Sequence, residues 1–159
     1  MRFAAPLIGA LLLTTPAAYP APFTLEQVLS APFASDIVAA PAGRAVAWAS
    51  DARGRRNVWL ALGRSANAGF AAHPLTHYTA DDGLEISDIA FVPGHEELLY
   101  VLGGDIEYPD KPAPDPAQLA SGVEQQVYIV DFRGHAPMKL GDGHAPLASP
   151  DGGRIIFLH

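Results

Sequence analysis

Three short stretches of the chain share one order of apolar and polar positions. Each begins with a few apolar residues, continues with a proline and a polar turn, and ends in a second apolar run. An aromatic residue falls seven positions after each proline, and the three prolines are 52 and 57 residues apart. The pairs are Pro41 with Trp48, Pro93 with Tyr100, and Pro150 with Phe157. A pattern that returns at a spacing of this order indicates a repeat protein, in which each repeat is one supersecondary unit.

The residues around each proline predict a tight turn between two antiparallel strands. Proline fixes φ for the first central position of a turn, and glycine or aspartate is suited to the next positions. The chain places Gly43, Gly94, Asp151 and Gly152 there. The 15 prolines and 15 glycines of the chain are spread along its length, which is typical of many short elements joined by turns.

Further strands can be predicted inside each repeat. Residues 57–62 match residues 126–132 as a third strand, and Trp59 and Tyr128 occupy matching places. Fourth strands are expected to start at Pro74 and Pro137. Four short antiparallel strands per repeat form the blade of a β-propeller. We therefore expect an all-β fold, a partial propeller of about two and a half four-stranded blades, at residues 35–78, 84–141 and 144–159.

The third repeat reaches only two strands at His159. Propellers have about four to eight blades, and an unpaired sheet edge favours aggregation. We expect the chain to be a fragment of a longer product that is poorly soluble alone. The alternative is that several copies assemble and complete one another's blades.

Two segments outside the repeated strands carry their own predictions. Residues 104–123 contain four prolines and extend the second repeat, which predicts a surface loop, either a contact loop or a simple decoration. Residues 23–29 have a weak helical pattern with Thr24 as the N-cap, which predicts one helical turn in a lead-in segment at 22–34.

The N-terminus has the layout of a secretory signal peptide. Arg2 precedes a short apolar run at residues 7–13 and a small-residue stretch at 14–18. We expect residues 1–21 to be this signal, with cleavage between 17 and 21, and the protein to be exported to the periplasm or secreted. The run is too short for a stable membrane anchor, and the alternative is a buried N-terminal helix.

Composition excludes several functions. The net charge is −7 and no cluster of lysine and arginine occurs, so nucleic-acid binding is not expected. The chain has no cysteine, which excludes disulfides, zinc–thiolate sites and thiol nucleophiles.

The chain offers few residues that could act in catalysis or bind a metal. Ser65 lies in a stretch that lacks the second glycine of a nucleophile elbow. His73 and His77 lack an obvious third metal ligand, and Pro74 separates them. Eight acidic residues are interpreted as turn positions, solvated positions or positions that lead into a strand: Asp81, Asp82, Glu85, Asp88, Glu96, Glu97, Asp142 and Asp151. Trp48 and Trp59 are interpreted as aromatics of the core between blades. We expect no catalytic residue, no metal and no cofactor in this chain.

One family shares the more specific motifs. The stretch Pro74–Gly83, with the residues that follow at 86–91 and 100–105, resembles the N-terminal propeller of bacterial prolyl oligopeptidase and dipeptidyl peptidase IV-like serine peptidases. Residues 139–146 and the Ser-Pro-Asp-Gly turn at 149–152 are also similar to that family, although TolB-type propellers share the turn. The resemblance covers residues 23–159.

The resemblance implies a role in peptide hydrolysis without the chemistry. In that family the propeller restricts access to a C-terminal α/β-hydrolase domain, which carries the serine, aspartate and histidine and acts on peptides. No residue of this chain matches the triad or the paired glutamates that hold a substrate's amino terminus. Val92 and His95 also depart from the serine and glycine of the family's turn. A periplasmic TolB-like protein-binding scaffold is the alternative.

Overall fold

The structure, a computed structural model, describes residues 23–41, 43–65, 69–104, 120 and 122–159. The described residues form one short helix, α1 (Leu25–Leu29), and ten strands in three antiparallel sheets. The all-β prediction with four-stranded antiparallel sheets is confirmed. The predicted signal at residues 1–21 and most of the predicted loop at 104–123 lie outside the described residues.

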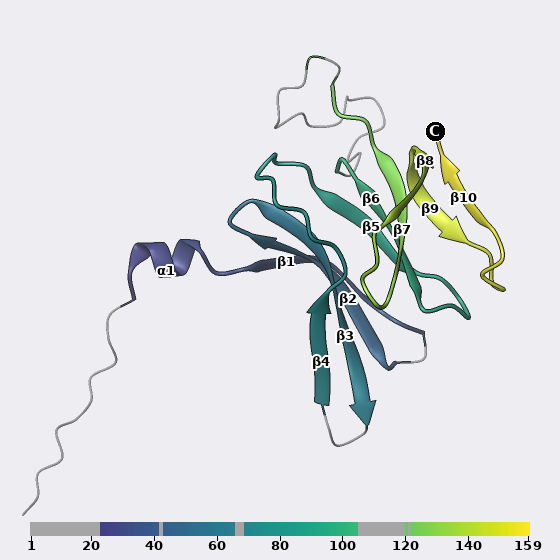
Figure 1. Cartoon of the computed structure of the whole chain (residues 1–159), viewed down its shortest axis with the longest axis horizontal. Coiled ribbons are helices and arrows are strands. Elements are labelled where there is room, and N and C mark those ends of the chain that lie inside the picture. The colour runs from purple at the N-terminus through teal and green to yellow at the C-terminus, as the bar shows by residue number, and fades with distance from the viewer. Residues whose placement is uncertain (1–22, 42, 66–68, 105–119, 121) are drawn as a thin grey trace, which may run out of the picture.

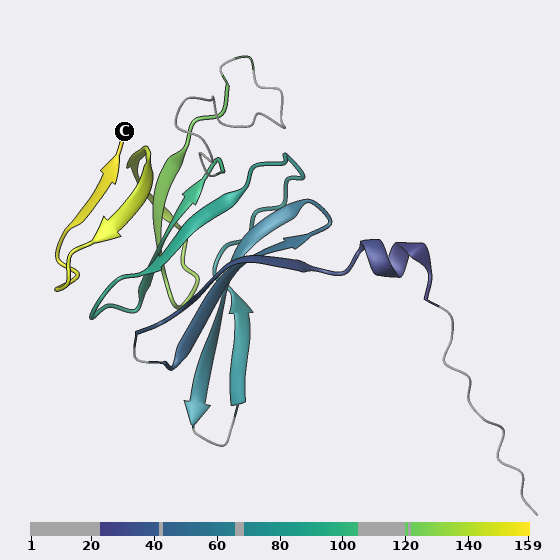
Figure 2. The same cartoon turned by 180° about the vertical axis from the view of Figure 1, so that it is seen from behind.

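The three sheets follow one another in chain order. Sheet I contains β1 (Phe33–Ala39), β2 (Ala45–Ala52), β3 (Arg55–Ser65) and β4 (Gly69–Pro74). Sheet II contains β5 (Ile86–Phe91), β6 (Glu97–Leu102), β7 (Gln126–Asp131) and β8 (Met138–Asp142). Sheet III is the hairpin of β9 (His144–Ala148) and β10 (Ile155–Leu158). In sheets I and II each strand pairs with the next strand in the chain, and sheet II lies between the other two (Figures 1 and 2).

The fourth strand of the first repeat was predicted wrongly. It does not begin at Pro74 but ends there, and β4 starts five residues earlier at Gly69. Proline has no N–H for a further ladder bond. Beyond it, the Thr76 hydroxyl accepts the N–H of Val58 at 2.9 Å in place of a backbone carbonyl. The second repeat follows the prediction more closely, because β8 starts at Met138.

The proline turns form as the sequence predicts. In each, the carbonyl before the proline accepts an N–H from three residues later: Gly43 to Ala40 at 2.8 Å, His95 to Val92 at 3.2 Å, and Gly152 to Ser149 at 2.8 Å. Gly94 has a φ of 74° at the second central position, and Gly43 and Gly152 follow the turn at 68° and 70°. These left-handed values explain the glycines, because other residues avoid them.

A bulge recurs in the first strand of every sheet. The residue five positions before each turn proline has a left-handed φ although it is not glycine: Asp36 at 48°, Asp88 at 53° and Ala145 at 50°. In all three sheets the pairing register shifts across this residue. A bulge bends its strand and increases the local twist. The first strands are neighbours in space, since β5 packs against β1 and β9 packs against β5.

Each sheet has two different faces. The aromatic face carries the residue seven positions after the turn proline: Trp48 in sheet I, Tyr100 in sheet II and Phe157 in sheet III. The aliphatic face carries its alternate neighbours, such as Ala47 and Ala49, Leu99 and Val101, and Ile156 and Leu158. The aromatic face of sheet II packs on the aliphatic face of sheet I and forms the main core, in which Tyr100, Leu98 and Leu60 are fully buried.

Sheet III repeats this arrangement on sheet II. The Phe157 ring lies so close to Gly141 of β8, and to Gly143 between β8 and β9, that a Cβ atom on either glycine would collide with it. Leu99, Val101 and Val127 on the aliphatic face of sheet II are fully buried. The same pairing of faces therefore occurs twice in the chain.

The predicted helical turn before the sheets is confirmed. Thr24 accepts the N–H of Gln27 at 3.1 Å, and the Gln27 side chain accepts the N–H of Thr24 at 2.9 Å, a reciprocal capping box. None of the helical residues is buried. Within the described part of the chain, no helix has the length and apolar character needed to cross a membrane.

Candidate binding site between the first two sheets

A cavity of about 580 Å³ opens between sheets I and II where their turns meet. The turn between β1 and β2, the end of β3, the turn between β5 and β6, and the turn after β7 all contribute to it. Two of the three proline turns therefore line the same hollow. Its volume falls within the usual range for small-molecule sites, about 300–1,000 Å³.

The cavity has an apolar wall and several charged residues. Leu62, Phe91 and Phe132 supply large apolar side chains, and the Phe91 and Phe132 rings meet edge-on with centroids 5.8 Å apart. Arg44, His95, Glu96 and Arg133 also line it. Both arginines are exposed, so their guanidinium groups are available to an anionic group of a ligand. The lining thus offers an apolar surface together with positive and negative side chains.

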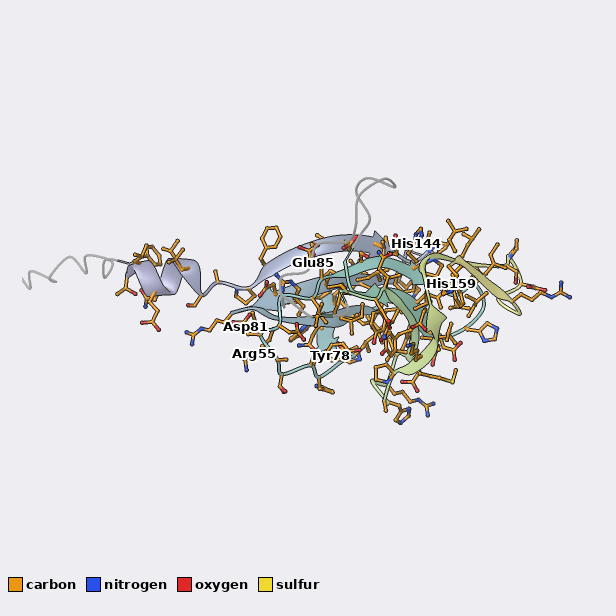
Figure 3. The ribbon with its side chains drawn as sticks, turned by 90° about the horizontal axis from the view of Figure 1, so that it is seen from above. Arg55, Tyr78, Asp81, Glu85, His144 and His159 are labelled. Atoms are coloured by element: carbon orange, nitrogen blue, oxygen red, sulfur yellow. The ribbon has the colours of Figure 1, made fainter. Side chains whose placement is uncertain are left out.

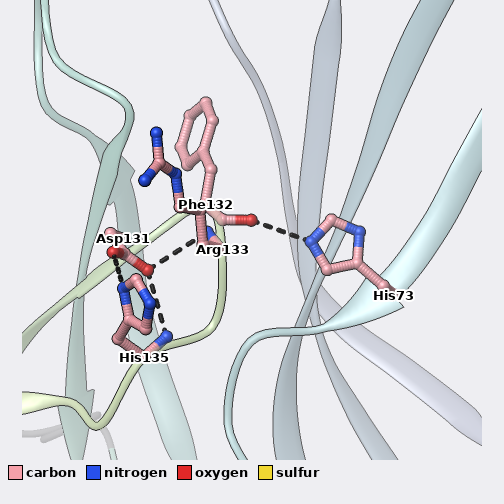
Figure 4. Close-up of polar contacts among 5 residues, drawn as sticks. All are labelled: His73, Asp131, Phe132, Arg133 and His135. Atoms are coloured by element: carbon pink, nitrogen blue, oxygen red, sulfur yellow. Dashed lines mark hydrogen bonds and ion pairs between the residues drawn. The ribbon is translucent and has the colours of Figure 1, made fainter.

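A hydrogen bond joins the two sheets beside this cavity. The Nε2 atom of His73, on β4, lies 2.8 Å from the carbonyl oxygen of Phe132, and donates to it in the tautomer with a proton on Nε2 (Figure 4). The turn that carries Phe132 is itself fixed by Asp131. Its carboxylate accepts the backbone N–H groups of Arg133 and His135, each at 3.1 Å, and contacts the His135 ring at 2.5 Å. The N–H of His135, together with its side chain, lowers the pKa of Asp131.

The turn at Pro150 packs against the turn at Pro93, which lines the cavity. The Cα of Gly152 lies against the Pro93 carbonyl and the His95 ring, and a Cβ atom there would collide with both. The Ser149 hydroxyl donates to Asp151 at 2.5 Å and holds the turn closed. That bond lowers the pKa of the Asp151 carboxyl, with help from the N–H of Gly153.

Polar groups inside the core are joined to one another. The Tyr78 and Tyr100 hydroxyls are 2.6 Å apart, and burial raises the pKa of both phenols. Asn57 bonds the backbone N–H of Tyr78 at 2.6 Å and its carbonyl at 3.0 Å, and accepts the Thr76 hydroxyl at 2.9 Å. This network fixes the segment after β4 onto β3.

Four of the five predicted aromatics lie in two cross-strand pairs. Trp48 is opposite Trp59, with centroids 6.1 Å apart, and Tyr100 is opposite Tyr128, with centroids 5.4 Å apart. Tyr100 is in the core between sheets I and II. Trp48 and Trp59 are half-buried on the aromatic face of sheet I, which is turned away from sheet II. Phe157 packs on sheet II.

The sequence candidates for chemistry do not come together. Ser65 ends β3, and the next described element is the strand β4 rather than a helix. His73 is on β4, whereas His77 is exposed beyond it. Glu96 is exposed in its turn, and Asp82 accepts the N–H of Leu84 within its own loop at 3.0 Å.

Other titratable groups are also dispersed. Figure 3 shows His144 and His159 beside sheet III, well separated from Arg55, Tyr78 and Asp81. No three histidine or acidic residues of the described ranges are grouped so that they could hold a metal ion.

The main cavity residues were not singled out from sequence: Arg44, Leu62, Phe91, Phe132 and Arg133. Phe91 and Phe132 lie at or next to the ends of predicted strands, and nothing in the pattern shows that these ends meet. Their aromatic type at two strand ends of one repeat is the only signal that could have found them.

The lining of the cavity combines apolar residues with arginine, histidine and glutamate. Among the described residues that line it, none carries a hydroxyl or thiol, so it contains no serine or cysteine nucleophile. No protein-family description, curated protein or solved structure matches the chain.

Proposed function

We propose that the chain is the propeller segment of an exported serine peptidase, where it controls the entry of peptides and takes no part in bond cleavage. The catalytic serine, aspartate and histidine belong, in this proposal, to an α/β-hydrolase domain of the parent protein. Residues 1–21 act as its signal peptide.

The repeated sheet geometry is the observation that carries the propeller part. Three sheets share a bulge five residues before the turn proline, the same turn hydrogen bond, and an aromatic seven residues after it. The first strands of successive sheets are neighbours, and each aromatic face packs on the preceding aliphatic face. Blades around a propeller axis have this relationship, with the first strand of each blade nearest the axis.

The peptidase part rests on the motif block that begins at Pro74. In the structure this block is the segment that Asn57 and Thr76 fasten to β3.

The cavity of about 580 Å³ between sheets I and II also fits a second candidate, a TolB-like binding scaffold. The Ser149–Asp151 bond stabilises the Ser-Pro-Asp-Gly turn, which propellers of both kinds share. In a scaffold of this kind, the cavity between sheets I and II would bind a segment of another protein.

Expression of the complete reading frame of the source gene tests the proposal. Its product is assayed with short peptides and with a folded protein that contains the same peptide sequences. A serine-reactive fluorophosphonate serves as the inhibitor. We expect cleavage of the short peptides only, blocked by the inhibitor, and no cleavage by residues 1–159 alone. A frame that contains further repeats but no hydrolase domain would contradict the peptidase proposal and favour the scaffold.

A further inference from the structure

The stack of three sheets exposes an apolar face at each of its two ends. At one end lies the aromatic face of sheet I, with Trp48 and Trp59 half-buried and Phe70 58% exposed. At the other end lies the aliphatic face of sheet III, where Leu147, Ile156 and Leu158 are 64%, 67% and 60% exposed.

The register shows that these faces are of the types that pair inside the chain. Trp48 and Trp59 are opposite each other in sheet I as Tyr100 and Tyr128 are in sheet II. The Tyr100 side of sheet II is buried against the aliphatic face of sheet I. The Trp48 side of sheet I is the equivalent surface, and no sheet of the described chain covers it.

The exposed end of sheet III has the corresponding pattern. Ile156 pairs with Leu147, and both point away from Phe157, whose ring contacts sheet II. On the equivalent face of sheet II, Leu99 and Val101 are fully buried, and sheet III contacts this sheet through β9. Leu147 and Ile156 therefore stand where the next aromatic face would pack.

We propose that two copies of this chain associate head to tail, with the aliphatic face of sheet III in one copy packed on the aromatic face of sheet I in the other. The contact continues an interface that is already formed twice within the chain, between sheets I and II and between sheets II and III. A second copy is the occupant that carries the matching face. The inference rests on the register of the three sheets and concerns residues 1–159 as a separate chain; in the longer parent protein proposed above, the next repeat would occupy the face of sheet III that the second copy covers here.

The contact is heterologous, because each copy contributes a different surface. Blocking one surface therefore leaves the other able to bind. Trp48→Glu places a carboxylate on the aromatic face of sheet I, and Ile156→Glu places one on the aliphatic face of sheet III. Both side chains point away from the main core, so both variants should retain cooperative thermal unfolding.

Sedimentation velocity of the full chain tests the proposal at micromolar concentration. We expect assemblies larger than a monomer for the unmodified chain, monomers for each variant alone, and a dimer when the two variants are mixed in equal amounts. The mixed dimer forms through the one unblocked surface on each variant and cannot grow further. Residues 1–22 are present in every sample, so association through them would persist in both variants alone.

Three results would overturn the proposal: a monomeric unmodified chain, variants that still associate alone, or a mixture that remains monomeric. If Trp48→Glu does not unfold cooperatively, Phe70→Glu serves as the second variant on the same face, because that ring is largely exposed. Arg154→Glu is the control: this side chain is exposed and lies before β10, outside the proposed contact, and the variant should assemble like the unmodified chain.

Discussion

The backbone N–H of Ala145, in sheet III, donates a hydrogen bond of 3.1 Å to the carboxylate of Asp88, in sheet II. Both residues have a left-handed φ, and each lies five positions before the turn proline of its own sheet. Equivalent positions of successive repeats thus contact each other directly. The repeat is a property of the sequence and also of the way the sheets pack.

Replacement of Asp88 tests this contact. Asp88→Ala removes the acceptor of the Ala145 N–H and puts alanine in a left-handed conformation, so we expect a loss of about 2 kcal/mol in the free energy of unfolding. Asp88→Asn keeps a side-chain oxygen and tolerates the same φ, and should lose less than half as much. Urea unfolding measures both, and hydrogen exchange should be faster at the amide of Ala145 in the alanine variant. Equal losses in the two variants would show that the bond does not stabilise sheet III.

Two turn glycines form a matched pair for a second test. Gly43 and Gly152 have φ values of 68° and 70°, but only Gly152 has neighbours that a Cβ atom would strike. Gly43→Ala should lower the free energy of unfolding by about 1 kcal/mol through backbone strain alone. Gly152→Ala should lose roughly 1–3 kcal/mol more, because the second turn has to move. Similar losses for both would mean that the second and third turns are not in contact.

The hydroxyl of Thr76 is expected to stabilise the segment after β4. It is buried, accepts the N–H of Val58 and donates to Asn57. Thr76→Val has nearly the same shape and leaves the Val58 N–H buried without its partner, which should cost about 1–3 kcal/mol in urea unfolding. Thr76→Ser keeps the hydroxyl and should cost less. A valine variant as stable as the serine variant would contradict this role.

Alkaline pH should weaken the core through the tyrosine pair. Burial raises the pKa of Tyr78 and Tyr100, so the folded state keeps both phenols neutral while the unfolded state ionises near the ordinary value of about 10. Their contribution is complete below that pH and is lost as the pH rises above it. Urea unfolding over a pH series, together with tyrosinate absorbance, measures this.

The double variant Tyr78→Phe with Tyr100→Phe is the control for the alkaline experiment. It removes both phenols, so its stability should fall less steeply above about pH 10 than that of the unmodified chain. An unchanged slope would show that other groups cause the alkaline loss.

The turns and most strands could be predicted because their signals are local. Proline sets φ by its own ring, so Pro41, Pro93 and Pro150 predict the turns without knowledge of the rest of the chain. The alternation of apolar residues around Trp59 and Tyr128 similarly predicts the third strands. The start of β4 could not be predicted, because its residues gain their strand pairing only from the long strand β3.

The bulges and the cavity depend on contacts between repeats. Asp36 and Asp88 tolerate a left-handed φ better than most residues, but Ala145 has no such property and adopts it only in its tertiary context. The cavity requires two turns between strands, the end of β3 and the turn after β7 to meet. Its arginines and phenylalanines have no spacing in the sequence that predicts this.

The DNA sequence of the source gene beyond the codon for His159 tests the central claim most directly. The account predicts that the frame continues through further units with a turn proline and an aromatic seven residues later, and then into a G-x-S-x-G elbow with later aspartate and histidine. A stop codon directly after His159 would contradict the assignment of this chain to a serine peptidase.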